Sequence, residues 1–397
     1  MEYSKIGDIC LKVCSGGTPT SSNPNYYNGG IPWLNTNEVN FCNIYSTNKT
    51  ISQEGLEHSA AKYIPANTVI VAMYGVTAGK SAIAKIPLTT NQACCNLVID
   101  EAKADYRYVY YFLKQQSDNL NKLANGGAQQ NLNSLIIKKY KIALPNLNVQ
   151  HRIASILSTY DTLIENNTKR IRLLEKMAEN LYKEWFVRFR FPGHEKVEME
   201  NGLPKGWKRG TLSDVVEFQN GFAFKSDTFC NGGMYSIVTI KNVQAEGFDG
   251  SNTDKIAEIP QRMPGYCKLR QGDILISLTG NIGRVCRVQG YGYLLNQRVA
   301  KLKSSFPFYT YCLFKSDYIF QSLNVISYGT AQLNLSPIKA SKIRVAIPSQ
   351  KNIEYFEHKV SSMFNELDNL QHQNTLLARQ RDLLLPRLMS GKLEVTP

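Results

Sequence analysis

The sequence predicts an α+β fold in which two globular domains, arranged as a tandem repeat, are each followed by a long helix. Three observations predict this: a motif that recurs 203 residues downstream, short β-branched runs between glycine and asparagine turns, and two long stretches with a heptad pattern. The second heptad stretch repeats the register of the first. We therefore expect the two helices to pair as an antiparallel coiled coil. The alternative is that each helix lies on its own domain.

The duplication is clearest where residues 126–132 (GGAQQNL) match residues 329–335 (GTAQLNL). The strand-like runs that follow end at Pro145 and Pro348, again 203 residues apart. Weaker matches lie upstream, in the pairs of residues 91–92 and 296–297 and in two glycine-rich turns. Solenoid units are about 20–50 residues long, so a period of this length indicates two copies of a whole domain.

Five segments follow from these signals, in chain order. The first domain covers residues 1–148, with strands expected near 68–74 and 95–99 and a helix near 106–122. The first helical segment covers 149–190, and a polar, turn-rich linker covers 191–206. The second domain covers 207–348, with strands near 273–278 and 283–288 and a helix near 307–323, and the second helix and a C-terminal tail cover 349–397.

The heptad pattern predicts which residues line the seam between the two helices. Asn167 and Asn374 also fall in this seam, where a polar residue can fix the register of the pair at a cost in stability. The alternative is that both asparagines point sideways to water. The predicted apolar seam residues are Ile164, Ile171, Leu174, Leu181, Trp185, Leu367, Leu370, Leu377, Leu384 and Leu388.

The 397 residues include 46 Lys and Arg against 32 Asp and Glu, giving a formal charge of +14 at pH 7. Such a surplus favours a polyanionic partner such as nucleic acid, although a basic surface without any partner gives the same count. No stretch approaches the ~20 apolar residues of a membrane-spanning helix, and residues 1–8 lack the apolar core of a signal peptide. Nine scattered cysteines without a C-x-x-C pair indicate reduced thiols, so we expect a cytoplasmic protein that binds no membrane.

Motifs that suggest catalysis fail on spacing. Residues 75–81 (GVTAGKS) have three residues between their glycines where a phosphate-binding loop has four, and the second copy has Arg284 in place of the lysine. Residues 23–26 (NPNY) lack the second proline of an amino-methyltransferase motif. Residues 100–103 (DEAK) lack the Pro-Asp half of a nuclease metal site, and the five histidines show no metal-ligand spacing. We therefore expect a binding protein without catalytic or metal-binding residues.

Nearly the whole chain resembles the specificity subunit of type I restriction–modification enzymes. The strongest stretch is residues 144–157 (LPNLNVQHRIASIL), followed by 160–164 (YDTLI) and 181–186 (LYKEWF). Residues 203–207 (LPKGW) and 385–393 (LPRLMSGKL) also resemble family signatures. Where the family has Glu-Gln before Ile-Ala, this chain has Val-Gln, which puts only local contacts at the start of the helix in doubt.

The resemblance implies that the two domains are target recognition domains, each reading one half of a bipartite, asymmetric DNA site. The helices are then spacers that dock two modification (methyltransferase) subunits, which carry S-adenosylmethionine. Restriction (motor-nuclease) subunits with ATP and Mg complete the complex, and the specificity subunit itself binds no cofactor. A helix of about 37 residues rises ~55 Å, while DNA advances ~3.4 Å per base pair, so such a helix can separate two readers by about one DNA turn.

Candidate DNA contacts lie in four kinds of loop: basic glycine turns, Asn-Gln pairs, the repeated loops that follow glycines near residues 129 and 332, and loops where the copies differ in sequence. A cation and backbone N–H groups suit phosphate, whereas amides suit adenine and a guanidinium suits guanine. The alternative for each is a turn or cap side chain that holds the scaffold together. The candidates are Lys80, Ser81, Asn91, Gln92, Gln129, Asn35 and Asn37 in the first domain, and Arg284, Asn296, Gln297, Arg298, Gln332, Lys241 and Asn242 in the second.

Two other functions remain open on the sequence alone. One is a scaffold or inhibitor that binds the same methyltransferase without reading DNA sequence. The other is a single-chain restriction–modification enzyme, which would need catalytic motifs that we do not find in the sequence.

Overall fold

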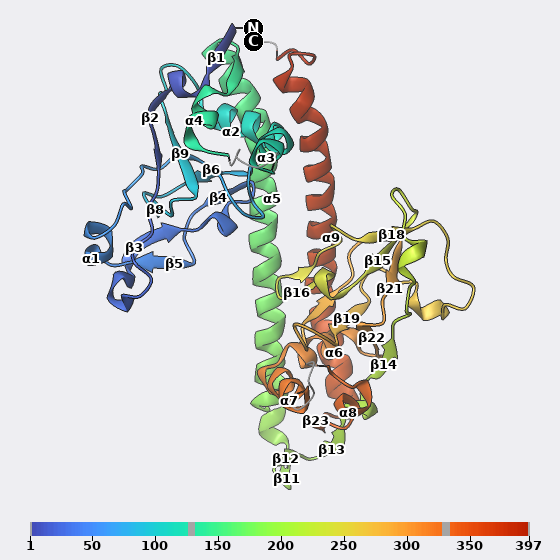
Figure 1. Cartoon of the computed structure of the whole chain (residues 1–397). Helices are drawn as coiled ribbons and strands as arrows, with labels where there is room; N and C mark the ends of the chain where they lie inside the picture. The colour runs from blue at the N-terminus through green and yellow to red at the C-terminus, as the bar shows by residue number, and fades with distance from the viewer. Residues whose placement is uncertain (1, 126–131, 328–333, 396–397) are drawn as a thin grey trace. The chain divides into compact units, whose positions relative to one another are not determined.

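The computed structural model describes residues 2–125, 132–327 and 334–395, which form two compact units. Unit 1 comprises residues 1–164 together with 377–397, and unit 2 comprises residues 165–376. Figure 1 shows the two long helices, α5 (Leu147–Tyr182) and α9 (Gln350–Met389). Each helix crosses the boundary between the units, so both units contain a segment of α5 and a segment of α9.

Unit 1 is built on three sheets. The largest has the strand order β2-β9-β6-β7-β4, the second β5-β3-β8, and the third pairs β1 with β10. The strands β1, β2, β3, β4 and β5 are Glu2–Lys5, Cys10–Ser15, Tyr27–Leu34, Cys42–Ile44 and Lys49–Ile51. The strands β6, β7, β8, β9 and β10 are Val69–Ala72, Ser81–Ala84, Thr89–Thr90, Cys94–Ile99 and Lys141–Leu144.

Unit 2 repeats most of this topology, with four strands in its main sheet where unit 1 has five. Its sheets have the orders β14-β22-β19-β20, β18-β15-β21 and β13-β23, and β3–β8 and β15–β21 are the matching parallel pairs. The strands β13, β14, β15 and β18 are Lys208–Thr211, Glu217–Asn220, Tyr235–Val238 and Asp254–Ile256. The strands β19, β20, β21, β22 and β23 are Ile274–Ser277, Val285–Arg287, Tyr293–Leu295, Val299–Lys303 and Arg344–Ile347, and a small hairpin joins β16 (Val243–Gln244) to β17 (Gly247–Phe248). The predicted α+β class and duplication are therefore confirmed.

Each helix that we expected within a domain is in fact two helices. Unit 1 has α2 (Tyr106–Gln115) and α3 (Ser117–Asn125), and unit 2 has α6 (Pro307–Lys315) and α7 (Asp317–Ser327). At the break in unit 2, Ser316 has extended backbone angles and its hydroxyl donates to the Leu313 carbonyl, which satisfies an end carbonyl of α6. The short helices α1 (Gln53–Glu57), α4 (Ser134–Lys139) and α8 (Pro337–Ser341) complete the set of α-helices in the described residues.

The two long helices run antiparallel within each unit. In unit 1, Ile153, Leu157 and Leu388 belong to one buried cluster, which also receives side chains of α2, and the half-buried Leu384 packs against it. In unit 2, the aromatic rings of Trp185 and Phe356 lie 5.8 Å apart, whereas Arg170 pairs with Glu366 at 2.7 Å. Residue numbers rise along one helix as they fall along the other, which confirms the predicted antiparallel coiled coil.

The predicted seam residues are all buried or half-buried, and the two seam asparagines lie with them. The Asn167 side-chain amide donates to the Gln373 side-chain oxygen at 3.3 Å, and Asn374 donates to the Thr168 hydroxyl at 3.3 Å. Asn167 is only 8% exposed. The interpretation in which both asparagines point sideways to water is therefore wrong.

The segment that we expected to be a polar linker has structure of its own. Helix α5 passes into one π-helical turn at Lys183–Val187, and a small hairpin of β11 (Met199–Glu200) and β12 (Leu203–Pro204) follows. The Phe191 ring stacks on Trp207 at 5.5 Å. This aromatic contact ties the segment to the core of unit 2. Across the described residues, no helix is long and apolar enough to cross a membrane.

Candidate nucleic-acid interface

Two loops of unit 1 meet beside the glycine turn that joins β6 to β7. One is the 3-10 turn Thr36–Glu38 after β3, and another is the segment at Asn91 between β8 and β9. The Asn91 backbone N–H donates to the Leu34 carbonyl at 3.0 Å, and the Thr77 hydroxyl of the glycine turn donates to the Thr36 carbonyl at 2.7 Å. The fold thus gathers candidate residues that are up to 57 positions apart in sequence, from Asn35 to Gln92.

The polar side chains of this cluster partly restrain one another. Lys80 donates to the Asn40 side-chain oxygen at 2.8 Å and lies 5.9 Å from the centre of the Phe41 ring. Asn91 donates to the Asn35 side-chain oxygen at 3.4 Å, and Gln92 accepts from the Thr18 hydroxyl.

The side chains of the 3-10 turn differ in how they are restrained. The Asn35 backbone N–H is capped by Glu38 at 3.1 Å. Asn37 is exposed, and among the described residues its side chain has no hydrogen-bond partner.

Unit 2 assembles the equivalent loops. The Asn296 backbone N–H donates to the Val238 carbonyl at 3.1 Å, as Asn91 does to Leu34. Arg284 follows the glycine turn and donates to the Gln244 side-chain oxygen at 2.9 Å, and Gln244 in turn donates to the Lys241 carbonyl. The side chains of Lys241, Gln297 and Arg298 are exposed. Both units therefore present a cation and an Asn-Gln pair on the same framework.

Two candidate residues are buried, so the structure gives them a scaffolding role. Ser81 is fully buried on β7. Asn242 is 1% exposed, and its amide donates to the carbonyls of Asp249 and Ser251 while its oxygen accepts from Thr239. We therefore leave both residues out of the proposed DNA contacts. Gln129 and Gln332 lie outside the described residues.

The glycine turns have backbone conformations that glycine adopts more easily than other residues. Gly75 and Gly79 have φ of +78° and +82°, and Gly280 and Gly283 have φ of +70° and +76°. A side chain at Gly79 would lie 2.7 Å from the Ser117 carbonyl oxygen at the start of α3. The residues after the turns form strands β7 and β20, whereas a phosphate-binding loop leads into a helix. The structure therefore supports rejecting the phosphate-loop interpretation.

Polar and ionic contacts join the globular part of each unit to the long helices. In unit 1, Asp161 on α5 accepts from the Tyr111 hydroxyl at 2.5 Å and also pairs with Arg381 on α9. In unit 2, Arg287 on β20 pairs with Asp368 on α9 at 2.9 Å. The Arg287 guanidinium also lies 5.4 and 4.9 Å from the centres of two phenylalanine rings, those of Phe308 and Phe364.

In each unit, a carboxylate accepts hydrogen bonds from the N–H groups at the start of the first helix after the main sheet. The carboxylate comes from a different part of the chain in the two units. In unit 1, Asp105 caps α2 itself and also contacts His151 on α5 at 2.6 Å. Burial raises the pKa of Asp105, but hydrogen bonds from Arg107 and His151 outweigh it and hold that pKa below its usual range. In unit 2, α6 has no cap of its own, and Glu357 on α9 accepts from the backbone N–H groups of Phe308 and Tyr309 at 2.9 and 3.1 Å. Burial raises the pKa of Glu357 to about 7.

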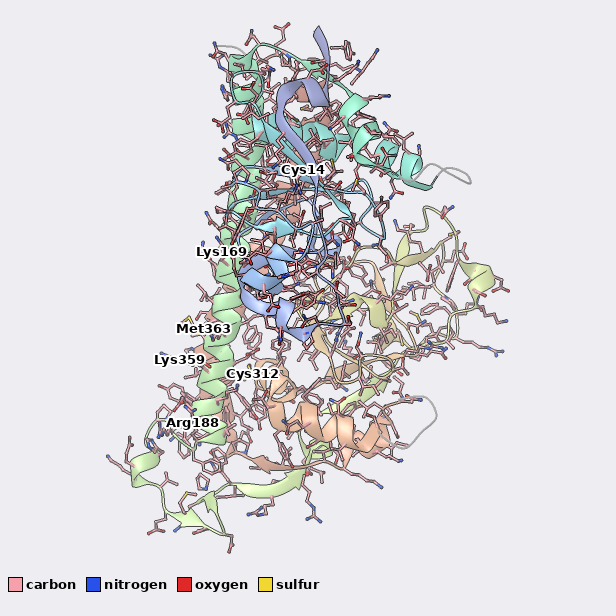
Figure 2. All side chains as sticks on the ribbon, turned by 60° about the vertical axis from the view of Figure 1, so that its left-hand side comes forward. Cys14, Lys169, Arg188, Cys312, Lys359 and Met363 are labelled. Atoms are coloured by element: carbon pink, nitrogen blue, oxygen red, sulfur yellow. The ribbon has the colours of Figure 1, made fainter. Side chains whose placement is uncertain are left out.

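The flank of the helical pair that faces away from these contacts carries exposed apolar side chains. On α5, Leu163 precedes the seam residue Ile164 and Met177 precedes the buried Ala178. Asp161 and Glu175, which contact the globular parts, lie on the other flank of the seam. Figure 2 labels Lys169 on α5, in the segment of this helix that belongs to unit 2. The exposed apolar residues of both helices are Ile156, Leu163 and Leu383 in unit 1, and Leu173, Met177, Tyr355 and Leu376 in unit 2.

Within the described residues, no group of three or more His, Cys, Asp or Glu side chains is placed to hold a metal ion. Burial raises the pKa of the Cys95 thiol to about 12, and burial raises the pKa values of Cys286 and Cys312 still further, so these thiols stay protonated near neutral pH.

Comparison with known proteins places the fold in a family. The family described as "Type I restriction modification DNA specificity domain" matches residues 1–176 and 204–378. The chain is 28% identical to the type I restriction enzyme MjaIX specificity subunit of Methanocaldococcus jannaschii, over 99% of this chain and 94% of that protein. It is 30% identical to the EcoR124I/EcoR124II specificity subunit of Escherichia coli, over 50% of each chain.

A solved structure supports the same fold. The crystal structure of a type I restriction–modification system S subunit from M. genitalium covers 100% of this chain and 96% of its own, with a TM-score of 0.57 at 19% identity. The two family matches fall on the two halves of the duplication and together cover most of the chain. The chain therefore belongs to the type I restriction–modification DNA specificity family.

Proposed function

We propose that this chain is the DNA sequence-recognition subunit of a type I restriction–modification complex, and that each unit reads one half of a bipartite, asymmetric site. The observation that carries the proposal is the repeated loop cluster, which has a common backbone framework and different side chains in the two units. Identical units would favour a palindromic site, whereas units that differ at their loops suit two different half-sites.

Within each cluster, the cations and the amides have separate tasks. Lys80 and Arg284 contact phosphate beside the glycine turns and so position the duplex. The exposed or half-buried amides and the guanidinium face base edges in the groove. These are Asn35, Asn37, Asn91 and Gln92 in unit 1, with Asn296, Gln297 and Arg298 in unit 2, where Lys241 adds a further charge.

Two modification (methyltransferase) subunits dock on the helical segments. The exposed apolar side chains on the flank of α5 and α9 support this, because apolar surface left in water is typical of a protein-binding face. S-adenosylmethionine is carried by those subunits, and ATP and Mg by the restriction (motor-nuclease) subunits. No step of catalysis is assigned to residues of this chain.

The test is to co-express this chain with its methyltransferase subunit in a host without other adenine methylation and to sequence the methylated DNA. We expect one split, asymmetric motif, methylated on both strands and absent without this chain. A stable complex that methylates no defined motif would favour a scaffold, and methylation by this chain alone would refute the claim that it is not catalytic.

A second experiment tests the spacer role of the helices. Inserting four residues after Thr168 adds about one helical turn. We expect the gap between the half-sites to lengthen while both half-sites stay unchanged. A changed half-site would contradict the proposed division between reading units and spacer.

A further inference from the structure

The glycine turns of the two units share a framework but differ at the tip. In unit 1 the tip is Val76, which is 96% exposed, and it follows Gly75. In unit 2 the tip is Asn281, which is also exposed and follows Gly280. Gly75 and Gly280 both have positive φ, so each turn begins with the same left-handed residue.

Both tips are held in place by their own unit. In unit 1 the Gly79 N–H donates to the Ala72 carbonyl at 2.8 Å, and Thr77 is anchored to Thr36. In unit 2 the Gly283 N–H donates to the Ser277 carbonyl at 3.1 Å, and the Ser277 hydroxyl donates to the Asn281 carbonyl. Pre-organised tips lose little conformational freedom on binding, which favours a defined contact over loose adhesion.

The position of Val76 is not explained by packing in unit 1. It is the most exposed large hydrophobic side chain of the described residues, and it belongs to none of their buried clusters. Its turn also carries Lys80 and lies against the Thr36–Glu38 turn, so an apolar group projects from a surface suited to DNA. The apolar group that the major groove offers is the 5-methyl of thymine.

Asn281 has the chemistry for a different base. The amide of an asparagine can donate to N7 of adenine and accept from its N6 amino group, whereas guanine presents two acceptors, N7 and O6, at the same edge. Among the described residues, the Asn281 side chain has no hydrogen-bond partner within unit 2 that would occupy the amide. The duplicated turn thus carries an apolar tip in unit 1 and an amide tip in unit 2.

We propose that the two turn tips read bases, with Val76 packing on a thymine methyl in one half-site and Asn281 hydrogen-bonding to an adenine in the other. This inference rests on the proposed function and names a base-reading pair outside the Asn-Gln segments. Neither residue contributes to the buried clusters, so both can be changed without disturbing the fold.

The first test replaces each thymine of the methylated motif in turn with deoxyuridine, which lacks only the 5-methyl group. Binding is measured with the complex of this chain and its methyltransferase subunits. We expect one thymine whose replacement weakens binding about three- to tenfold, in line with the burial of a single methyl group. With Val76→Ala, thymine and deoxyuridine at that position should bind equally, while other positions keep their preferences.

The second test replaces adenines with 7-deazaadenine, which lacks N7. One adenine should lose about tenfold or more in affinity, and Asn281→Ala should abolish that difference. Leu11→Ala is the control, because Leu11 is 71% exposed on β2 of unit 1 at the end away from the glycine turn. It should leave every base preference unchanged.

Three outcomes would overturn the inference while leaving the proposed function intact. One is that Val76→Ala weakens binding to all sequences equally. Another is that the thymine preference persists in Val76→Ala. The third is that the positions sensitive to Val76 and Asn281 fall in the same half-site. Absence of any split motif for the unmodified chain would instead count against the proposed function itself.

Discussion

Unit 1 and unit 2 support the same topology with different chemistry where they meet the long helices. Unit 1 buries aliphatic side chains such as Ile153 and Leu388 beside its sheets. Unit 2 buries aromatic rings at the equivalent place, where Phe356 lies 5.1 Å from Phe186. The difference teaches that the topology requires a filled core beside the long helices and hydrogen-bond acceptors for the N–H groups at the helix ends. Neither requirement fixes the residue type.

The largest expected effect comes from the cores at the helical segments. Phe356→Ala should destabilise unit 2 by about 3–5 kcal/mol, and Ile153→Ala at the equivalent position should destabilise unit 1 by about 2–4 kcal/mol. Amide hydrogen exchange resolved by peptide measures each unit separately. Loss of protection in α2 from Phe356→Ala, with α6 unaffected, would break the division into two units.

The ion pairs at the long helices, Arg287–Asp368 in unit 2 and Asp161–Arg381 in unit 1, should have the next largest effect. Arg287→Met retains an apolar side chain beside the stacked rings of Phe308 and Phe364. It removes the cation that pairs with Asp368, which then keeps the longer hydrogen bond from Gln289 at 3.5 Å, so unit 2 should lose about 2–3 kcal/mol. A Trp33→Phe background leaves Trp185 and Trp207 as the tryptophans, both in unit 2, so urea unfolding followed by tryptophan fluorescence reports that unit.

The matched change in unit 1 is Asp161→Asn, which should leave the urea midpoint of unit 2 in that background unchanged. If Asp161→Asn shifted the urea midpoint of unit 2 as much as Arg287→Met does, the two ion pairs would not be independent.

The helix caps come third. Asp105→Ala should destabilise unit 1 by about 1–2 kcal/mol, because it removes the acceptor at the start of α2. Asp105→Asn should recover most of this loss, since an amide oxygen can still accept from the Arg107 N–H. Exchange rates of the α2 amides measure both effects, and equal loss in the two variants would assign the effect to charge instead of capping.

The smallest effect sharpens the comparison through pH. Since the pKa of folded Glu357 is raised to about 7, folding takes up a proton between the ordinary carboxyl range and pH 7, and this stabilisation is lost as pH rises through 7. Glu357→Gln keeps an acceptor for the α6 N–H groups without titrating. The melting temperature of Glu357→Gln minus that of the unmodified chain should therefore be larger at pH 8 than at pH 5.5. The same difference at both pH values would contradict the raised pKa.

Much of the fold could be predicted because duplication and heptad spacing are local patterns. The period of 203 residues and the seam from Ile164 to Leu388 needed no knowledge of tertiary contacts. The breaks at Gln116 and Ser316 were missed because the apolar pattern continues across them. The apolar spacing of a helix does not reveal a single residue at which the helix is interrupted.

The candidate site was harder to predict, because the burial of polar side chains depends on the assembled unit. Asn242 sits in a loop and has a side chain suited to adenine, yet its hydrogen bonds to Thr239 and Asp249 close a turn. Arg287 and Glu357 lie 81 and 49 positions from the residues they bond. The sequence does contain a signal for the exposed Val76, because an apolar residue directly after a turn glycine is expected to project into solvent.

The division of the chain also has a consequence for biosynthesis. Unit 2 is one continuous stretch, whereas unit 1 needs residues from Leu377 onward, including Arg381 and Leu388, to complete its buried cluster. These residues leave the ribosome only after all of unit 2 has been made. The domain that is translated first is thus finished last, and a nascent chain that stalls within unit 2 carries an N-terminal half still open to chaperones and proteases.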